Sequence, residues 1–537
     1  MIRCLIRSAQ SSNNTLQICI CRTASSQRSY SVSSETKEKN DKPFSSVPAP
    51  PRLPLIGHLH LFRKRGRPDG PVARVLAFGA LGMAVCPYSF ERLYDAYADL
   101  YKQCGPIVRL DLGIKMLLLF RPEDIAMLFA DTNELPQRPL FEALRHYRLK
   151  RKNLYSCAGL TTENGEEWWR LRQSVQFLMH PTFSKSYFSL QEQIAEDFGE
   201  FINRTKDQSG IVQNFLQDIY RYTEEAVGLV CFGKRLNLFP LHPGEEETDF
   251  SKQLTQAADD TLKSMADTLL GTPWWKIFPT PTYKKLARAQ DFFQRFAAKC
   301  IDEAKSKLSD PQYKDDGKLE LIKKLFQDKN LKPNDISLLM TELFSAGIDA
   351  TGNAIGFTLY NLTKKLDVQE KLFQDIQKHA PNGLTAESIA NMKYLKACIQ
   401  ESHRLTPAVG GIARILQRPT VLSGYKVPPK VLCIGLQPII ARQEQYFDDP
   451  LDFKPERWLD ETQTKFERKS HPYIVTPFSH GLRRCIGQRF AEQEINLCIV
   501  KIIQKFRIEY DGPEIGFVMR MSLVPDKPLN LKFIPRK

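Results

Sequence analysis

Apolar residues recur every three to four positions along most of the chain after residue 88, which is the spacing of amphipathic helices. This spacing predicts helices over 91–103, 186–204, 212–232, 250–269, 281–307, 334–365, 369–379 and 386–406. Strand-like runs predict β-structure near 107–120, 411–436 and 505–534. No repeat or linker interrupts this part of the sequence, so we expect one large, mainly α domain with a minor β portion.

The first 34 residues follow no such pattern and contain four arginines, nine serines and no acidic residue. That composition is typical of an organellar transit peptide, with a disordered tail as the alternative. A polar, proline-rich lead-in over 35–54 follows, and we expect the main domain over 55–537. No run of 18 apolar residues is present, so we expect no transmembrane anchor. The pattern of residues 63–86 predicts neither a structure nor a role for that segment.

The chain is basic, with 76 Lys and Arg against 61 Asp and Glu, and carries a net charge of +15. Without the arginines of 1–34 the excess is about +11. The sequence has no nucleic-acid motif, so the charge favours anionic lipid or an acidic protein partner. The twelve cysteines are scattered without a CxxC pair, which argues against a zinc site or a disulfide framework.

The stretch with the most specific chemistry is Phe478–Gly487, in which Cys485 lies beside two arginines and between two glycines. We expect a helix to begin just after Cys485, so that its N–H groups and dipole lower the pKa of the thiol. Gly481 and Gly487 would let a flat ligand approach the backbone closely. A thiolate in this setting is a candidate axial ligand of haem iron, and such ligation favours O–O bond cleavage.

This segment resembles the F-x-x-G-x-R-x-C-x-G motif of the cytochrome P-450 family of haem-thiolate monooxygenases. The resemblance implies a cytochrome P-450-type haem-thiolate domain with haem b as cofactor and Cys485 as the ligand of its iron. Arg483 would bind a haem propionate, and Phe478 and Gly487 would belong to the same cofactor-binding segment.

Three residues elsewhere resemble the family's other propionate ligands. Trp168 and Arg172 are four residues apart on one predicted helix, as in the family's W-x-x-x-R motif. Arg414 stands where the family often places another propionate-binding arginine. The resemblance therefore assigns all three to cofactor binding.

A structural network is implied by two more motifs. Glu401 and Arg404 resemble the family's E-x-x-R helix motif, and Pro455–Trp458, which includes Arg457, resembles its P-E-R-W segment. The implied Glu401–Arg404–Arg457 network stabilises the haem-side core and takes no part in catalysis.

Ala346–Thr351 resembles the distal A-G-x-D-T segment of the family, where small residues leave room for O₂. Asp349 and Thr351 are therefore the candidate catalytic residues, which would relay protons. Ala350 stands where the family has the threonine, and Thr351 lies about 100° further around the helix. Either a local bulge brings Thr351 into place, or water and Asp349 carry the protons. Ala350 also leaves open a haem-thiolate protein that does not activate O₂.

The N-terminal composition and the tracts 138–172 and 489–494 are similar to the mitochondrial group of the family. Members of that group lie peripherally on the matrix side of the inner mitochondrial membrane. The segment 271–279, rich in aromatic residues and followed by lysines, would contact the membrane or pack in the core.

Electrons in the mitochondrial group come from an acidic [2Fe–2S] ferredoxin that an NADPH-dependent reductase reduces. Lys396 matches one lysine of the ferredoxin site, whereas Gln400 replaces a second. Arg484 and Arg489 are therefore the further candidates for ferredoxin contact.

The substrate is indicated only by framework segments. Residues 413–428 and 525–529 look similar to the arthropod enzymes that hydroxylate ecdysteroid precursors at C22. The resemblance implies a sterol substrate, with other mitochondrial steroid hydroxylases and xenobiotic-oxidising members as the alternatives.

Overall fold

The computed structural model describes residues 41–52, 57–58, 61–63, 88–130, 135–139, 141–239, 248–269, 273–459 and 471–536. The predicted transit peptide over 1–34 and almost all of the segment 63–86 lie outside the described residues. Residues from Lys42 to Lys537 form one structural unit, to which the following description applies.

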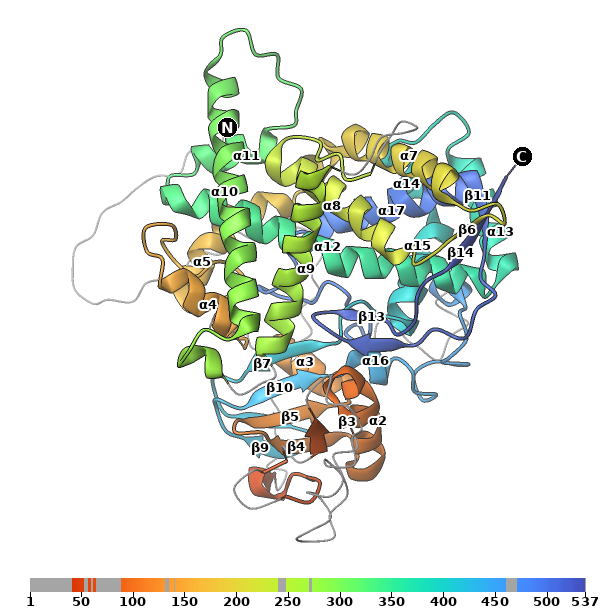
Figure 1. The fold of residues 1–537 in the computed structure, drawn as a ribbon. Coiled ribbons are helices and arrows are strands. Elements are labelled where there is room, and N and C mark those ends of the chain that lie inside the picture. Colours follow the sequence, from red (N-terminus) through yellow and green to blue (C-terminus); the bar gives the residue numbers. More distant parts are fainter. Residues whose placement is uncertain are drawn as a thin grey trace, which may run out of the picture. The chain divides into compact units, whose positions relative to one another are not determined.

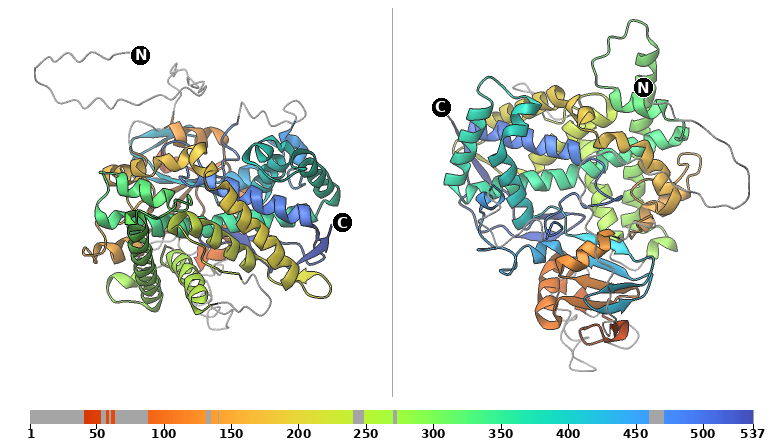
Figure 2. Two further views of the ribbon diagram at one scale, coloured as in Figure 1. Left: turned by 90° about the horizontal axis from the view of Figure 1, so that it is seen from above. Right: turned by 180° about the vertical axis from the view of Figure 1, so that it is seen from behind.

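Helices form the larger part of this unit, and a smaller part contains the main sheet (Figures 1 and 2). The helices are α2 (Leu93–Cys104), α3 (Pro122–Ala130), α4 (Glu142–Leu149), α5 (Gly165–Ser174), α6 (Pro181–Lys185), α7 (Phe188–Thr205), α8 (Leu216–Phe232), α9 (Asp249–Leu269), α10 (Pro281–Ser309), α11 (Glu320–Gln327), α12 (Pro333–Thr363), α13 (Leu366–His379), α14 (Ala386–Asn391), α15 (Lys393–Leu405), α16 (Gln437–Ile440) and α17 (Gln488–Lys505).

The helical periodicity located most long helices to within a few residues, with one correction. The range 386–406, predicted as one helix, is two helices separated at Met392, whose ψ of 83° lies outside the helical region. Met392 is fully buried in the core, so its side chain is packed against the rest of the protein at the point where the first helix ends and the second begins. Short α3, α4 and α11 were missed because eight or nine residues show too little periodicity.

Four strands form the main sheet, in the order β4-β5-β10-β7. Their bounds are β4 (Ile107–Asp111), β5 (Lys115–Leu119), β7 (Ile412–Ile415) and β10 (Leu432–Gly435). β10 runs parallel to β5 and antiparallel to β7, so residues some 300 positions apart pair directly. The sheet therefore brings β7 to the helical part, where Arg414 reaches the candidate site.

Short strands complete the fold. β8 (Thr420–Leu422) and β9 (Tyr425–Val427) pair with β1 (Lys42–Pro43), and β2 (Phe62–Arg63) pairs with β3 (Tyr88–Ser89). β11 (Phe506–Glu509), β14 (Leu531–Pro535) and β6 (Ile211–Val212) form a third sheet. β12 (Phe517–Met519) and β13 (Leu523–Pro525) form a hairpin beside α12.

Helix α12 runs through the helical part and joins two apolar cores (Figure 1). Buried apolar residues between Leu338 and Ile348 belong to one cluster, and others between Ala354 and Leu362 belong to the second. Glycines let α8 approach α12 closely: a Cβ at Gly347 would lie 2.7 Å from Val227, and one at Gly352 would lie 2.6 Å from the Tyr220 ring.

We expect Gly352→Ala to lower the free energy of unfolding by about 1–3 kcal/mol, because the added methyl would overlap the Tyr220 ring. The measurement is thermal unfolding of the cofactor-loaded protein. Gly199→Ala in α7 is the matched control, because its Cβ would meet only the flexible Lys505 chain, at 2.8 Å. The midpoint of thermal unfolding of this control should equal or exceed that of the wild type, since alanine favours a helix.

Candidate functional site

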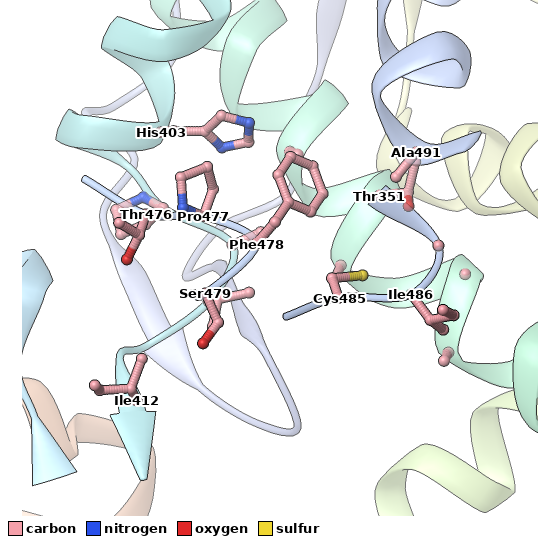
Figure 3. A pocket seen from close by; sticks show the side chains of 18 of the residues that line it. Thr351, His403, Ile412, Thr476, Pro477, Phe478, Ser479, Cys485, Ile486 and Ala491 are labelled. Carbon is pink, nitrogen blue, oxygen red and sulfur yellow. The ribbon is translucent and has the colours of Figure 1, made fainter. Parts of the chain in front are cut away.

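A cavity of about 540 Å³ lies between α12 and the segment that leads into α17. On α12 it is bordered by small residues spaced along one face, Ala346, Gly347, Ala350 and Ala354. The segment Ile474–Ser479 and residues Arg483, Cys485 and Gly487 also border the cavity. Figure 3 shows Thr476 to Ser479 and Cys485 at the cavity together with Thr351 of α12. The small side chains of α12 therefore leave the cavity open, and the segment before α17 supplies its polar groups, among them Arg483 and Cys485.

The loop that carries Cys485 is closed by a hydrogen bond from the Cys485 N–H to the Phe478 carbonyl, at 2.9 Å. Ser479 and Gly481 have φ angles of 61° and 74°, which reverse the chain inside the loop. Helix α17 begins three residues after Cys485, close to the predicted position. A Cβ at Gly487 would meet no atom within 4 Å, so the backbone there is open to the cavity.

The Cys485 side chain is exposed, and its exposed surface faces the cavity (Figure 3). Burial raises the pKa of this thiol, while a hydrogen bond from the Gly487 backbone and the charges of Arg172 and Arg484 act to lower it. The Gly487 N–H at the start of the helix therefore acts in the predicted direction, but in the thiol without a ligand desolvation outweighs it and the net pKa is raised.

Four arginines lie close together: Arg138, Arg414 and Arg483 border the cavity, and Arg172 lies beside them. Burial, together with their mutual repulsion, lowers the pKa of Arg483 to about 8 and those of Arg172 and Arg414 to about 10. None of the four is within ion-pair distance of a carboxylate among the described residues. The Nη1 atom of Arg483 and the Nε atom of Arg138 are buried without a hydrogen-bond partner. A cluster of positive charges away from water is unfavourable without nearby anions, and the described residues supply no carboxylate to these arginines.

Trp168 and Asn164 hold Arg483 in place. The Arg483 guanidinium lies 3.6 Å from the centre of the Trp168 ring, and its Nη2 donates to Asn164 Oδ1 at 2.5 Å. Its Nε donates to the Pro136 carbonyl at 2.9 Å. Trp168 therefore packs against the Arg483 guanidinium and does not itself line the cavity. Arg172 does not line the cavity either.

Two cavity residues had no assigned role from the sequence. Arg138 was noticed only as part of a longer tract, because the segment around it has no periodicity that places it at the site. His403 lies inside the E-x-x-R motif, edge-on to Phe478 with ring centres 6.2 Å apart (Figure 3). Burial lowers the pKa of His403 to about 4, so it is neutral at physiological pH.

The two candidate catalytic residues on α12 point in different directions. Thr351 lines the cavity, and its hydroxyl makes no hydrogen bond with the described residues. Asp349 does not line the cavity, and its carboxylate accepts from Ser522 at 2.5 Å and from Asn353 at 3.2 Å. Helix α12 is α-helical throughout, so Thr351 reaches the cavity without the bulge considered above.

Comparison with known proteins gives the family directly, because the profile of cytochrome P-450 matches residues 68–533. The chain belongs to the cytochrome P-450 family. It is 30% identical to cytochrome P-450 302a1, mitochondrial, of Drosophila melanogaster, over 82% of this chain and 89% of that protein. It is also 30% identical to the mouse mitochondrial 1,25-dihydroxyvitamin D(3) 24-hydroxylase, over 92% and 89%.

Two further matches extend this relationship. The chain is 26% identical to ecdysone 20-monooxygenase of Drosophila melanogaster, over 94% of this chain and 91% of that protein. The crystal structure of a mutant cytochrome P-450DA haem domain matches with a TM-score of 0.70 at 20% identity, covering 91% and 98%. The fold is therefore that of the family, and the protein is a monooxygenase that binds haem b through a cysteine thiolate.

The residues at the cavity fit this cofactor. Haem b carries two propionates, which are the anions that the four arginines lack. Only Cys231 and Cys485 among the described cysteines border the cavity. Cys231 is buried in α8, and burial raises the pKa of its thiol far above the usual range. Cys485 is the one whose side chain is open to the space.

Glu401 is the centre of a buried hydrogen-bond network, one member of which, Arg404, also borders the cavity. Arg404 donates twice to its carboxylate, at 2.8 Å each, and Arg457 donates at 2.9 Å. Trp458 Nε1 and the Lys454 N–H complete the set at 2.8 and 3.0 Å. Arg404 also donates to three backbone carbonyls, of Ala441, Pro450 and Asp452. The network thus joins α15 to the segment 441–458.

The candidate ferredoxin contacts lie on α15 and at the start of α17. Lys396 is exposed and donates to the Ala390 carbonyl at 2.5 Å. Arg484 donates to Gln488, and Arg489 lies 3.4 Å from Glu492, which offsets part of its charge.

The aromatic segment after residue 273 is partly buried and partly exposed. Trp275 is buried and stacks on Tyr283, whereas Trp274, Ile277 and Phe278 are 53%, 77% and 52% exposed. No helix in the described part of the chain is both long enough and apolar enough to span a bilayer.

We expect Glu401→Gln to destabilise the protein by about 3–5 kcal/mol, because two buried guanidinium groups would lose their counter-charge. Haem retention and the midpoint of thermal unfolding measure the effect. Glu456→Gln is the control, because its ion-pair partner Lys371 is 53% exposed and Tyr394 can still donate to the amide oxygen, so the change should cost less than about 1 kcal/mol. Equal effects of the two substitutions would contradict the central role of Glu401.

Proposed function

We propose that the protein is a mitochondrial steroid hydroxylase in which the Cys485 thiolate would hold the haem iron. The observation that carries the proposal is the Cys485 side chain open to an apolar-walled cavity beside four arginines without carboxylate partners. When bound, haem supplies the activation of O₂ and the transfer of one oxygen atom to a substrate C–H bond.

The chain's own groups then have distinct tasks. Cys485 gives its thiolate to the iron, and the Gly487 N–H stabilises the charge on that sulfur. Arg483 and Arg138 offer unpartnered nitrogens to the propionates, with Arg172 and Arg414 adding positive charge. Anion binding restores the usual high pKa of these arginines and favours the folded holoprotein.

On the distal side, Ala346, Gly347 and Ala350 leave room for O₂ and substrate. Thr351 offers the cavity a hydroxyl that can hold a water or pass a proton. Asp349, two residues earlier on α12, is the acid that supplies protons from outside the cavity wall. Acid and hydroxyl together would hold and move a proton at the wall of the cavity.

The substrate is proposed to be an ecdysteroid precursor, hydroxylated at C22. Away from the arginines, the lining is apolar, with Val227, Val230, Leu269, Leu343 and Val409. Such walls suit a largely hydrocarbon molecule. Two of the relatives are named for steroid-type substrates, ecdysone and 1,25-dihydroxyvitamin D(3), which supports this class.

Electron supply is proposed to come from a mitochondrial [2Fe–2S] ferredoxin and its NADPH-dependent reductase. The names of several relatives include "mitochondrial", and the Arg- and Ser-rich residues 1–34 agree with import. Lys396, Arg484 and Arg489 provide positive charge for an acidic partner. The exposed Trp274, Ile277 and Phe278 are the proposed contact with the matrix side of the inner membrane.

We expect Cys485→Ser to lose the thiolate-type Soret band of the reduced, carbon-monoxide-bound protein, because the axial sulfur is absent. Cys231→Ser is the matched control, since Cys231 also borders the cavity, and it should keep that band. Retention of the band in Cys485→Ser would refute the ligand assignment.

With NADPH, ferredoxin and ferredoxin reductase, we expect hydroxylation of an ecdysteroid precursor at C22, detected by mass spectrometry. The rate should fall as salt is raised from low to physiological ionic strength, because charge attraction steers the ferredoxin. A matched precursor that already carries the C22 hydroxyl is the control and should give no product at that carbon. Turnover of aromatic xenobiotics without sterol turnover would contradict the steroid assignment.

A further inference from the structure

Asp349 is joined to a part of the chain far from α12 in sequence. Its Oδ2 accepts from the Ser522 hydroxyl at 2.5 Å, and its Oδ1 accepts from Asn353 Nδ2 at 3.2 Å. The same Asn353 nitrogen donates to Ser522 Oγ at 2.8 Å, which closes a ring of three side chains. Tyr220 from α8 donates to Asn353 Oδ1 at 2.8 Å and holds the amide in orientation.

Ser522 comes from the turn of the β12–β13 hairpin, which packs beside α12 (Figure 1). Ser522 is 7% exposed, and Leu523, the next residue, is fully buried and donates its N–H to the Ala408 carbonyl at 2.9 Å. The hairpin thus presents the hydroxyl from a fixed position. Ala350, directly after the acid on α12, has no hydroxyl to offer it.

The surroundings of Asp349 set its charge state. Burial raises the pKa of the Asp349 carboxyl, while hydrogen bonds from Ser522, Asn353 and Tyr220 and the charge of Arg520 lower it. These are the polar and charged groups that face it from α8, α12 and the hairpin. Among them Ser522 makes the shortest contact, so its removal should have the largest single effect.

We propose that Ser522 is a positioning residue that holds Asp349 for proton delivery to the cavity, so that the β12–β13 hairpin takes part in the reaction from behind α12. The carboxyl of Asp349 gives its proton, through solvent water, to the Thr351 hydroxyl, which passes its own proton into the cavity; hydronium from solvent then restores the proton on Asp349, while Ser522 stays a hydroxyl throughout. This inference rests on the proposed role of Asp349 in the reaction.

The test compares Ser522→Ala with Ser522→Thr in the full-length, haem-loaded protein. The infrared carboxyl band that Asp349→Asn abolishes is titrated with pH. Loss of one hydrogen bond to the charged carboxylate should move its midpoint up by about one pH unit in Ser522→Ala. Ser522→Thr, which keeps the hydroxyl, should stay at the wild-type midpoint.

The second readout is the product formed per NADPH and its pH profile. In Ser522→Ala we expect the yield to fall several-fold and the limb that Asp349→Asn removes to move to higher pH. The substrate KM and the reduced carbon-monoxide spectrum should not change. Ser345→Ala is the matched control, because it removes a buried α12 hydroxyl that has no hydrogen-bond partner.

Each result decides a different point. An unchanged midpoint in Ser522→Ala, or a Ser522→Thr variant that behaves like Ser522→Ala, would overturn the proposal. A shifted midpoint with an unchanged yield would show contact without a role in proton delivery and would also overturn it. If Asp349→Asn turns over normally, the proposed role of Asp349 fails, while the infrared titration still reads the contact with Ser522. Ser522→Cys, with a weaker donor, replaces Ser522→Ala if that variant does not fold.

Discussion

Four buried or half-buried guanidinium groups lie together at or beside the cavity without a carboxylate partner among the described residues. Burial and mutual repulsion lower the pKa of Arg483 to about 8, a large departure for a guanidinium. A fold with such a feature is stable only when an anion occupies the site. In the proposed function the propionates of haem meet this requirement, which would couple cofactor binding to folding and give the arginines a role in assembly.

A second buried cluster works in the opposite way, because all of its charges are satisfied within the chain. Glu401 accepts from Arg404, Arg457, Trp458 and the Lys454 backbone. It holds the helix that carries His403 against the segment 441–458 without help from a ligand. The charges of the Glu401 network are therefore balanced within the chain, whereas the arginines at the cavity have unpartnered nitrogens that a bound anion would satisfy.

Helix α12 separates two chemical environments. On one face Ala346, Gly347, Ala350 and Thr351 border the cavity, and elsewhere on the helix Asp349 is bound by Ser522 from the hairpin. The acid and the hydroxyl are two residues apart on one helix, yet they have different neighbours. Because Ala350 carries no hydroxyl, the hydroxyl that contacts Asp349 comes from Ser522 of the hairpin and not from the next residue of α12.

The sequence by itself determined the local features: the long helices, the cysteine loop before α17, and the positions of Glu401, Arg404 and Arg457 in their motifs. These follow from periodicity and short spacing, which depend on near neighbours in the chain. Only the tertiary structure decided that Arg138 joins Arg483 at the cavity, that Trp168 lies behind Arg483, and that Ser522 binds Asp349. Those contacts join elements up to 347 residues apart, as between Arg483 and Pro136, and no local pattern records which distant side chains the packing of helices and sheets brings together.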